Sequence, residues 1–197
     1  SRGYRPEEIF RIGKTLKNKA KRYYTVDNSI YENRKSAGNV IDKEAGILNR
    51  GNLTRLKNFL NRAAKGERLT VGFIGGSITQ GFAATDPDKC YAARTVAWLR
   101  KVFPNTEFDY VNAGIGATNS QFGAARVQED LLCRLPDLVM VEFSVNDHCT
   151  PHDMETYEGL IRQIYGSRSC PAMVLLHSVY YDTGKSAAYY HAQVGRH

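Results

Sequence analysis

The sequence has 197 residues, of which 42% are hydrophobic and 24% are charged, an ordinary balance for a globular protein. A chain of this length can bury a core without disulfides or metals, so we expect one domain preceded by an extension. No apolar stretch approaches the roughly 20 residues that cross a membrane, and the four cysteines stand singly, without a Cys-x-x-Cys pair. The composition therefore argues against a membrane span, a zinc site or a redox motif. We expect no metal, no cofactor and a cytoplasmic protein, unless a secretory signal has been removed.

The net charge of +7 is unevenly distributed along the chain. Residues 1–68 hold 17 Lys/Arg and seven Asp/Glu, whereas residues 69–197 hold 10 and 13. This asymmetry predicts a basic N-terminal extension over residues 1–50 and a folded domain over residues 51–197. The segment KTLKNKAKRYY, with its two tyrosines, has the composition of a nucleic-acid-binding arm. Such a run more often forms a solvated helix face, so no nucleic-acid partner is assigned.

Helices and strands alternate from residue 52 onward. The predicted helices span residues 52–67, 91–103, 121–135 and 154–167, and a further helix covers HAQVGRH at 191–197. The predicted strands span residues 69–76, 107–114, 137–145 and 172–181, each a short apolar run of the kind found in buried parallel strands. In the second helix we expect Val96, Leu99 and Val102 to face the core around Trp98. Alternating strands and helices imply right-handed crossovers, and hence a parallel sheet covered on both faces, a three-layer α/β/α domain.

Chemistry in such a sheet lies beyond the carboxyl ends of the strands. The four loops there read GGSITQG, NAGIGATNS, SVNDHCTPH and HSVYYDTG. The first loop has the glycine spacing of a phosphate-binding loop, but Phe82 stands where that motif needs lysine. The second loop lacks the third glycine of a dinucleotide-binding turn and follows the second strand of the sheet instead of the first. Both nucleotide interpretations are therefore rejected.

The first loop instead presents Ser77 on a tight strand-to-helix turn, where glycines leave a serine hydroxyl exposed. A serine that attacks an ester creates a tetrahedral oxyanion, which needs donors fixed about 3 Å from the developing charge. The second loop offers the backbone N–H groups of Gly114 and Gly116, and the third offers the side-chain amide of Asn146. Three neighbouring loops thus combine a nucleophile with oxyanion donors.

The stretches IGGSITQG, NAGIGAT and VEFSVND resemble the first three sequence blocks of the SGNH hydrolases, or GDSL-like lipase/acylhydrolase superfamily, in its GGSIT-type branch. The resemblance covers residues 69–180 in order and spacing. It implies a flavodoxin-like sheet and hydrolysis of small esters, with Ser77 as the nucleophile. It also implies an oxyanion hole made by the Ser77 N–H, the Gly116 N–H and the Asn146 side chain, with Gly114 as the alternative glycine.

Two departures from the family pattern concern the blocks themselves. Gly76 replaces the aspartate of the GDS motif, and Ser144 replaces the glycine of GxND; both replacements are typical of the GGSIT-type branch. The departure that affects the chemistry is the last block, an Asp-x-x-His that supplies the general base, because no histidine of this chain has aspartate three residues before it. We expect the 197 residues to stop before that block, so that the domain is incomplete at its C-terminus.

If the chain is complete as it stands, a substitute base is needed, because an unassisted serine is a weak nucleophile. His148, in the loop that carries Asn146, is the first candidate, and His177, at the end of the fourth strand, is the second. A histidine at either position is more often satisfied by local hydrogen bonds alone. Asp147, which has no matching histidine by spacing, is interpreted as a structural residue.

The sequence therefore predicts a serine esterase that removes short acyl groups through an acyl-enzyme on Ser77. The resemblance to the GGSIT-type branch implies acetyl groups on a carbohydrate as its substrate. The alternative is a non-catalytic module that uses the same fold to bind a carbohydrate or a protein partner, which the missing Asp-x-x-His favours. We expect no membrane partner, and the sequence does not indicate an oligomeric state.

Overall fold

The computed structural model describes residues 45–180 and 183–196. The chain divides into two compact units, of which the larger comprises Leu48–Tyr180 and Lys185–His197. All the helices and strands described below belong to this larger unit. The basic extension expected over residues 1–50 lies almost entirely outside the described residues.

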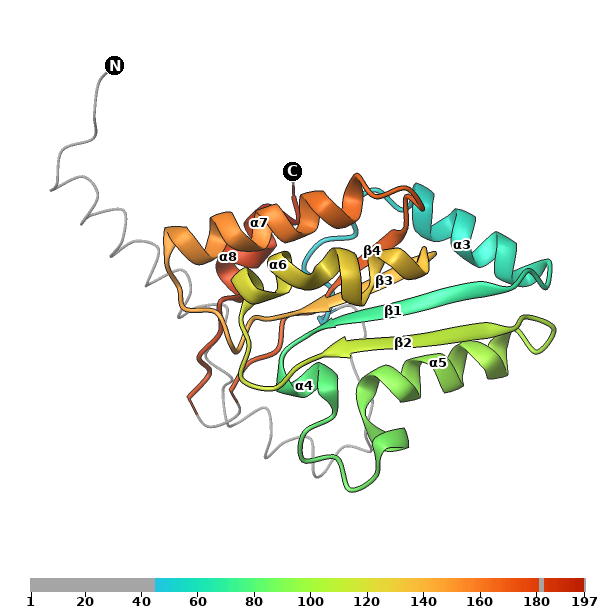
Figure 1. The fold of residues 1–197 in the computed structure, drawn as a ribbon, viewed down its shortest axis with the longest axis horizontal. Coiled ribbons are helices and arrows are strands. Elements are labelled where there is room, and N and C mark those ends of the chain that lie inside the picture. Colours follow the sequence, from blue (N-terminus) through green and yellow to red (C-terminus); the bar gives the residue numbers. More distant parts are fainter. Residues whose placement is uncertain (1–44, 181–182, 197) are drawn as a thin grey trace, which may run out of the picture. The chain divides into compact units, whose positions relative to one another are not determined.

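The larger unit alternates strands and helices, as the sequence pattern predicts (Figure 1). The strands are β1 (Leu69–Gly75), β2 (Phe108–Gly114), β3 (Leu138–Glu142) and β4 (Ala172–Leu175). The α-helices are α3 (Thr54–Ala64), α4 (Ser77–Gln80), α5 (Tyr91–Val102), α6 (Ser120–Asp130), α7 (Pro151–Tyr165) and α8 (Ala188–Val194). Two 3-10 turns, η1 (Pro87–Lys89) and η2 (Leu132–Arg134), complete the described elements.

The four strands form one parallel sheet in the order β2-β1-β3-β4. This is the order that begins a flavodoxin-like fold, in which the chain reverses its direction of growth between the first and third strands. Gly75, the last residue of β1, pairs with Gly114 on one side and with Glu142 on the other. Strands β1, β2 and β3 therefore end at the same level, and their exit loops begin side by side.

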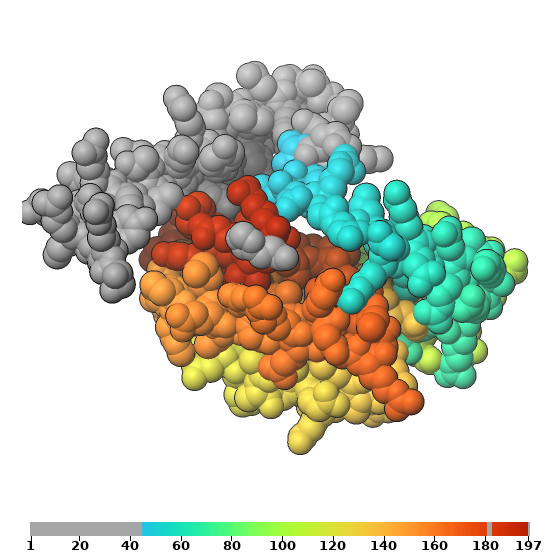
Figure 2. Space-filling model, turned by 90° about the horizontal axis from the view of Figure 1, so that it is seen from above, coloured from blue at the N-terminus to red at the C-terminus, as the bar shows by residue number. Residues whose placement is uncertain are grey.

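Two apolar clusters cover the two faces of the sheet. On one face, α3 and α5 pack through residues such as Phe59 and Val96 against Val71 and Phe73 of β1. On the other face, α6 and α7 pack through residues such as Val127 and Leu160 against Ile74, with α8 at the edge of the same cluster. Figure 2 looks onto this second layer and shows α6 alongside α7. The predicted three-layer α/β/α architecture is confirmed.

Several details of the sequence prediction are wrong, among them the end of the third strand, predicted at residue 145 and found at Glu142, and the last helix, predicted over 191–197 and found over Ala188–Val194. In α5, Val96 and Leu99 are buried as expected, but Trp98 is 57% exposed and Val102 is 45% exposed. The reason is geometric: α5 covers only the β1 and β2 side of the sheet through one stripe, and Trp98 lies off that stripe. Helix α6 ends at Asp130, after which the chain forms the turn η2 instead of continuing to residue 135. Strand β4 ends at Leu175, short of the predicted residue 181.

None of the helices among residues 45–180 and 183–196 is long and apolar enough to cross a membrane.

Candidate functional site

Ser77 lies immediately beyond the end of β1, as the first residue of the short helix α4. Its side chain is partly buried, and its N–H belongs to the first turn of a helix, where amides have no acceptor within the helix. Helix α4 ends after one turn because Gly81 adopts a left-handed conformation, with φ of 99°. The turn thus presents Ser77 at the carboxyl edge of the sheet, as the glycine-rich sequence predicts.

The two glycines before Ser77 are required by close packing. A Cβ atom on Gly75 would lie 2.1 Å from Thr79 Oγ1 and 2.4 Å from the Glu142 carbonyl oxygen. Thr79 is itself fully buried and shares a 2.9 Å hydrogen bond with the hydroxyl of Tyr91. The turn that carries the serine is therefore held against β3 and α5 at a distance that only glycine permits.

Asn146 lies against the backbone that leads into Ser77. A Cβ atom on Gly76 would meet Asn146 Oδ1 at 2.3 Å and Asn146 Nδ2 at 3.1 Å, so the carboxamide is packed directly on Gly76. The Asn146 backbone N–H donates to the Phe143 carbonyl at 2.9 Å, which fixes the start of the loop. Asn146 Oδ1 is buried without a hydrogen-bond partner among the described residues. The structure thus places the Asn146 carboxamide against the turn that carries Ser77.

Gly116 is the glycine of the second loop that lies next to Ser77. A Cβ atom on Gly116 would lie 3.8 Å from Ser77 Cβ. The Gly116 N–H donates to the side-chain oxygen of Gln80 at 2.9 Å. The second loop therefore brings a backbone N–H group close to Ser77, and this N–H donates its hydrogen bond to the Gln80 side chain of α4.

Gly114, the alternative glycine, is placed differently. Its N–H donates to Asn112 Oδ1 at 2.9 Å within its own loop. The backbone of α4 packs directly on the Cα of Gly114, because a Cβ atom on Gly114 would lie 2.3 Å from the Gln80 nitrogen. Gly114 thus allows α4 to approach β2, and the geometry favours Gly116 as the donor to an oxyanion on Ser77.

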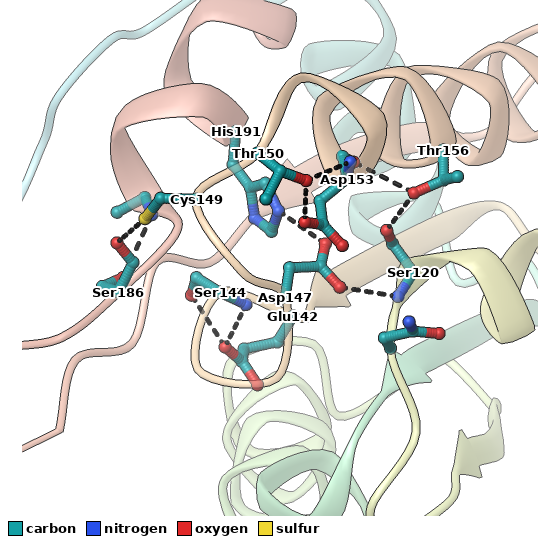
Figure 3. A network of polar contacts seen from close by, with 12 residues as sticks. Ser120, Glu142, Ser144, Asp147, Cys149, Thr150, Asp153, Thr156, Ser186 and His191 are labelled. Carbon is teal, nitrogen blue, oxygen red and sulfur yellow. Dashed lines mark hydrogen bonds and ion pairs between the residues drawn. The ribbon is translucent and has the colours of Figure 1, made fainter. Parts of the chain in front are cut away.

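Asp147 pairs with a histidine that spacing along the chain does not reveal. His191, on α8, places its Nε2 2.9 Å from Asp147 Oδ2, and neither side chain is exposed (Figure 3). The second carboxylate oxygen accepts the Ser120 N–H at 2.8 Å, and the Tyr157 ring stacks on the imidazole at 3.6 Å between centroids. The expectation that Asp147 has no histidine partner is wrong, whereas these buried contacts agree with its interpretation as a structural residue. The pair is closed to solvent, so it connects α8, α6 and the Asn146 loop instead of reaching a substrate.

Glu142 is a buried carboxylate that the sequence analysis did not single out. It ends β3, its side chain has no exposed surface, and its Oε1 accepts hydrogen bonds from both the N–H and the hydroxyl of Ser144, at 3.0 and 2.8 Å. Burial raises the pKa of the Glu142 carboxyl, and the two hydrogen bonds from Ser144 oppose that rise. Ser144, which stands where the family's GxND motif has glycine, therefore fixes the Glu142 carboxylate at the start of the third loop through these two hydrogen bonds. The missed signal is a glutamate inside an apolar strand.

The two candidate bases occupy different environments. His148 is exposed, in the loop after Asn146. His177 is partly buried beyond β4, and its Nδ1 is buried without a partner among the described residues. Burial lowers the pKa of His177 to about 4, with a smaller contribution from the neighbouring His191. At neutral pH His177 is therefore uncharged but a weak base, and neither imidazole hydrogen-bonds Ser77 within the described part of the chain.

A cavity of about 350 Å³ opens beside the second loop, between the end of β2 and α6. Its lining includes four charged side chains, Arg126, Glu129, Asp130 and Arg134, and it does not include Ser77. Pockets for small ligands are mostly apolar, and this charged cavity does not open onto Ser77. Within residues 45–180 and 183–196, no three His, Cys, Asp or Glu side chains are grouped so as to hold a metal ion.

Comparison with known proteins supports the family resemblance. The sequence model of the GDSL-like Lipase/Acylhydrolase family matches residues 73–196. A two-domain esterase (CEX) active on acetylated mannans, crystallised with mannopentaose, is similar over 80% of this chain, with 51% identity and a TM-score of 0.79. A second structure of an esterase of that description is 52% identical over 78% of the chain, with a TM-score of 0.77. The chain spans 44% and 41% of the lengths of these two structures.

A more distant structure shares the fold. It is a catalytic mutant of Axe2, an acetylxylan esterase from Geobacillus stearothermophilus, which is 22% identical over 65% of this chain and 70% of its own, with a TM-score of 0.53. No curated protein matches the chain significantly. The family match covers well over half of the sequence and includes all three loops that meet at Ser77. The chain belongs to the GDSL-like lipase/acylhydrolase family.

Proposed function

We propose that this protein is a serine ester hydrolase that removes short acyl groups through an acyl-enzyme on Ser77. The observation that carries the proposal is the meeting of three loops around one serine: the Asn146 amide packs on Gly76, next to Ser77, and a Cβ on Gly116 would lie 3.8 Å from Ser77 Cβ. A side-chain amide and backbone N–H groups that converge on a serine are the donors that acyl transfer requires.

In the proposed reaction, Ser77 Oγ attacks the carbonyl carbon of the ester and its proton passes to a general base. The carbonyl oxygen becomes an oxyanion, which the N–H groups of Ser77 and Gly116 and the Asn146 amide stabilise. The bond from the carbonyl carbon to the alcohol oxygen then breaks, and that oxygen takes the proton. Water attacks the acyl group on Ser77 in the second half, which releases the acid and restores the serine hydroxyl.

The proposed reaction also needs a general base that takes the proton of Ser77. Among the described residues, His148 and His177 are the candidates, and they differ in what they offer. His148 follows Asn146 by two residues and is exposed, whereas burial lowers the pKa of His177 to about 4. A base works best with a pKa near the working pH, which counts against His177, so His148, in the loop of Asn146, is the candidate that we favour.

We further propose that the substrate is an acetylated carbohydrate. The support comes from the two-domain esterases, which are active on acetylated mannans and are 51% and 52% identical to this chain. Acetylated manno-oligosaccharides are therefore the first substrate to test, with p-nitrophenyl acetate as a substrate that needs no sugar contacts.

The experiment compares the full-length gene product with its Ser77→Ala variant. We expect a fluorophosphonate probe to label Ser77 and acetate to be released from acetylated manno-oligosaccharides, and both signals to vanish in Ser77→Ala. The matched control is Ser167→Ala, at the end of α7, where the hydroxyl only donates to the Ile164 carbonyl at 2.8 Å; it should keep both activities. Full activity of Ser77→Ala would disprove the proposal.

A binding module is the second candidate, and one observation favours it: the Gly116 N–H is already occupied by the Gln80 side chain. On that view the surface around Ser77 binds an acetylated sugar without cleaving it. The same experiment separates the two, because a binding module leaves Ser77 unlabelled while the oligosaccharide still binds in a calorimetric titration.

A further inference from the structure

Gln80 is the last residue of α4, three positions after Ser77, and its backbone is held in place. Its N–H donates to the Gly76 carbonyl at 3.0 Å. The Gln80 nitrogen also packs closely on Gly114, because a Cβ atom on Gly114 would lie only 2.3 Å from it. The side chain is exposed. The exposed carboxamide of Gln80 can therefore change its rotamer while the backbone of α4 keeps its position.

The Gln80 carboxamide oxygen lies on the face of Gly116 that looks toward the nucleophile. It accepts the Gly116 N–H at 2.9 Å. A Cβ atom on Gly116 would lie 2.8 Å from this oxygen and 3.8 Å from Ser77 Cβ. The Gln80 oxygen therefore accepts the hydrogen of the Gly116 N–H, the same donor that the proposed function assigns to the carbonyl oxygen of the substrate.

One N–H group cannot give a full hydrogen bond to two carbonyl oxygens at once, because the bond weakens steeply as its angle departs from linear. A substrate oxygen must therefore displace Gln80 before Gly116 can stabilise it. We propose that Gln80 is a displaceable occupant of the oxyanion hole, which lowers the rate of acylation until a substrate replaces it. This inference rests on the proposed function.

The magnitude follows from the kind of bond that is lost. A neutral hydrogen bond contributes modestly to a net equilibrium, so releasing Gly116 should raise kcat/KM about threefold to tenfold. A carboxylate in place of the carboxamide should bind the same N–H more tightly, because bonds to ionised acceptors are stronger. The two substitutions are therefore expected to change the rate in opposite directions.

The test uses Gln80→Met, which keeps the length of the side chain but has no strong acceptor, and Gln80→Glu, in the full-length gene product. We expect Gln80→Met to raise kcat/KM for p-nitrophenyl acetate about threefold to tenfold and to speed hydrogen exchange at the Gly116 amide. Gln80→Glu should lower both. The matched control is Gln128→Met, at an exposed position of α6, which should change neither.

Two results would overturn the inference. If Gln80→Met speeds exchange at Gly116 but lowers or does not change kcat/KM, Gln80 is a tether for the second loop and not an occupant of the hole. If exchange at Gly116 does not change, the contact has no effect on that N–H in solution.

A third measurement separates failure of this inference from failure of the proposed function. If the wild-type protein leaves Ser77 unlabelled, the esterase proposal fails, and the affinity for sodium acetate, measured by calorimetry, then tests Gln80 by itself. Gln80→Met should bind acetate about threefold to tenfold more tightly than wild type, and Gln128→Met should not. Equal affinities in all three proteins would show that Gln80 does not compete for the site.

Discussion

His191 and Asp147 form a fully buried pair, with 2.9 Å between Nε2 and Oδ2. The two residues lie 44 positions apart, on α8 and in the loop after β3. Asp147 also accepts the Ser120 N–H at the start of α6, and it is the neighbour of Asn146. Figure 3 shows the consequence: through Asp147, the loop that carries Asn146 is attached to two helices from different parts of the chain.

Removal of the histidine from this pair should destabilise the protein strongly. His191→Ala leaves a buried carboxylate without its partner, which costs about 3–5 kcal/mol in the free energy of unfolding. His191→Gln keeps a donor near the carboxylate and should cost less. Urea unfolding followed by circular dichroism measures both.

The control for this prediction is the exposed pair Arg162–Glu158, at 2.6 Å on the surface of α7. Glu158→Gln should change the free energy of unfolding by only about 0.5 kcal/mol, because exposed ion pairs contribute little. Equal losses in Glu158→Gln and His191→Ala would show that the buried pair is not a structural connection.

The glycine before the turn gives a second prediction, on packing. Gly75→Ala would place a methyl group 2.4 Å from the Glu142 carbonyl oxygen, a backbone atom that cannot turn away. We expect a loss of about 1–3 kcal/mol or more in the free energy of unfolding and a displaced Ser77. Gly159→Ala, on α7 with nothing within 4 Å of the new methyl group, should instead stabilise the protein by up to about 1 kcal/mol. Thermal unfolding of the two variants tests this, and a stable Gly75→Ala variant would contradict the close packing of α4.

Asn146 gives a prediction about rate. Asn146→Ala should lower kcat/KM about 10²-fold to 10³-fold, because it removes one donor to the oxyanion, while Ser77 remains reactive toward a fluorophosphonate probe. The control is Asn61→Ala, at an exposed position of α3, which should leave the rate unchanged. Steady-state kinetics on p-nitrophenyl acetate measures the effect, and an unchanged rate in Asn146→Ala would remove this residue from the oxyanion hole.

The sequence predicted the parts of the site that depend on local pattern. Ser77 and Asn146 lie in the loops that follow two apolar strands. The carboxyl ends of neighbouring parallel strands meet at one edge, so the proximity of these two residues could be expected from the pattern of strands. The Asp147–His191 pair could not be found this way. The Asp-x-x-His pattern is a spacing of three residues along the chain, whereas this contact depends on where α8 packs against α7. The exposure of Trp98 was missed for a related reason, since periodicity gives the apolar stripe of a helix but not how much of it the sheet covers.

His177 gives the final prediction, on pH dependence. Burial holds its pKa near 4 in the folded protein, below the ordinary value of about 6.5 in an unfolded chain. As the pH falls below about 6.5, the unfolded state binds a proton at this position and the folded state does not. The protein should therefore lose stability between about pH 6.5 and pH 4, and His177→Gln should lose less over the same range.

The measurement is the free energy of unfolding in urea at several pH values in this range, together with a proton NMR titration of the His177 ring. Glu142 acts in the opposite sense, because its pKa is raised by burial and the folded state gains its proton first as the pH falls. The comparison is therefore repeated in a Glu142→Gln background, where this opposing contribution is absent: the total loss of stability toward pH 4 should be larger, and the difference made by His177→Gln should persist. His177 titrating near pH 6.5, or a pH dependence that is identical with and without its ring, would show that the imidazole is solvated and would make it a stronger candidate for the general base.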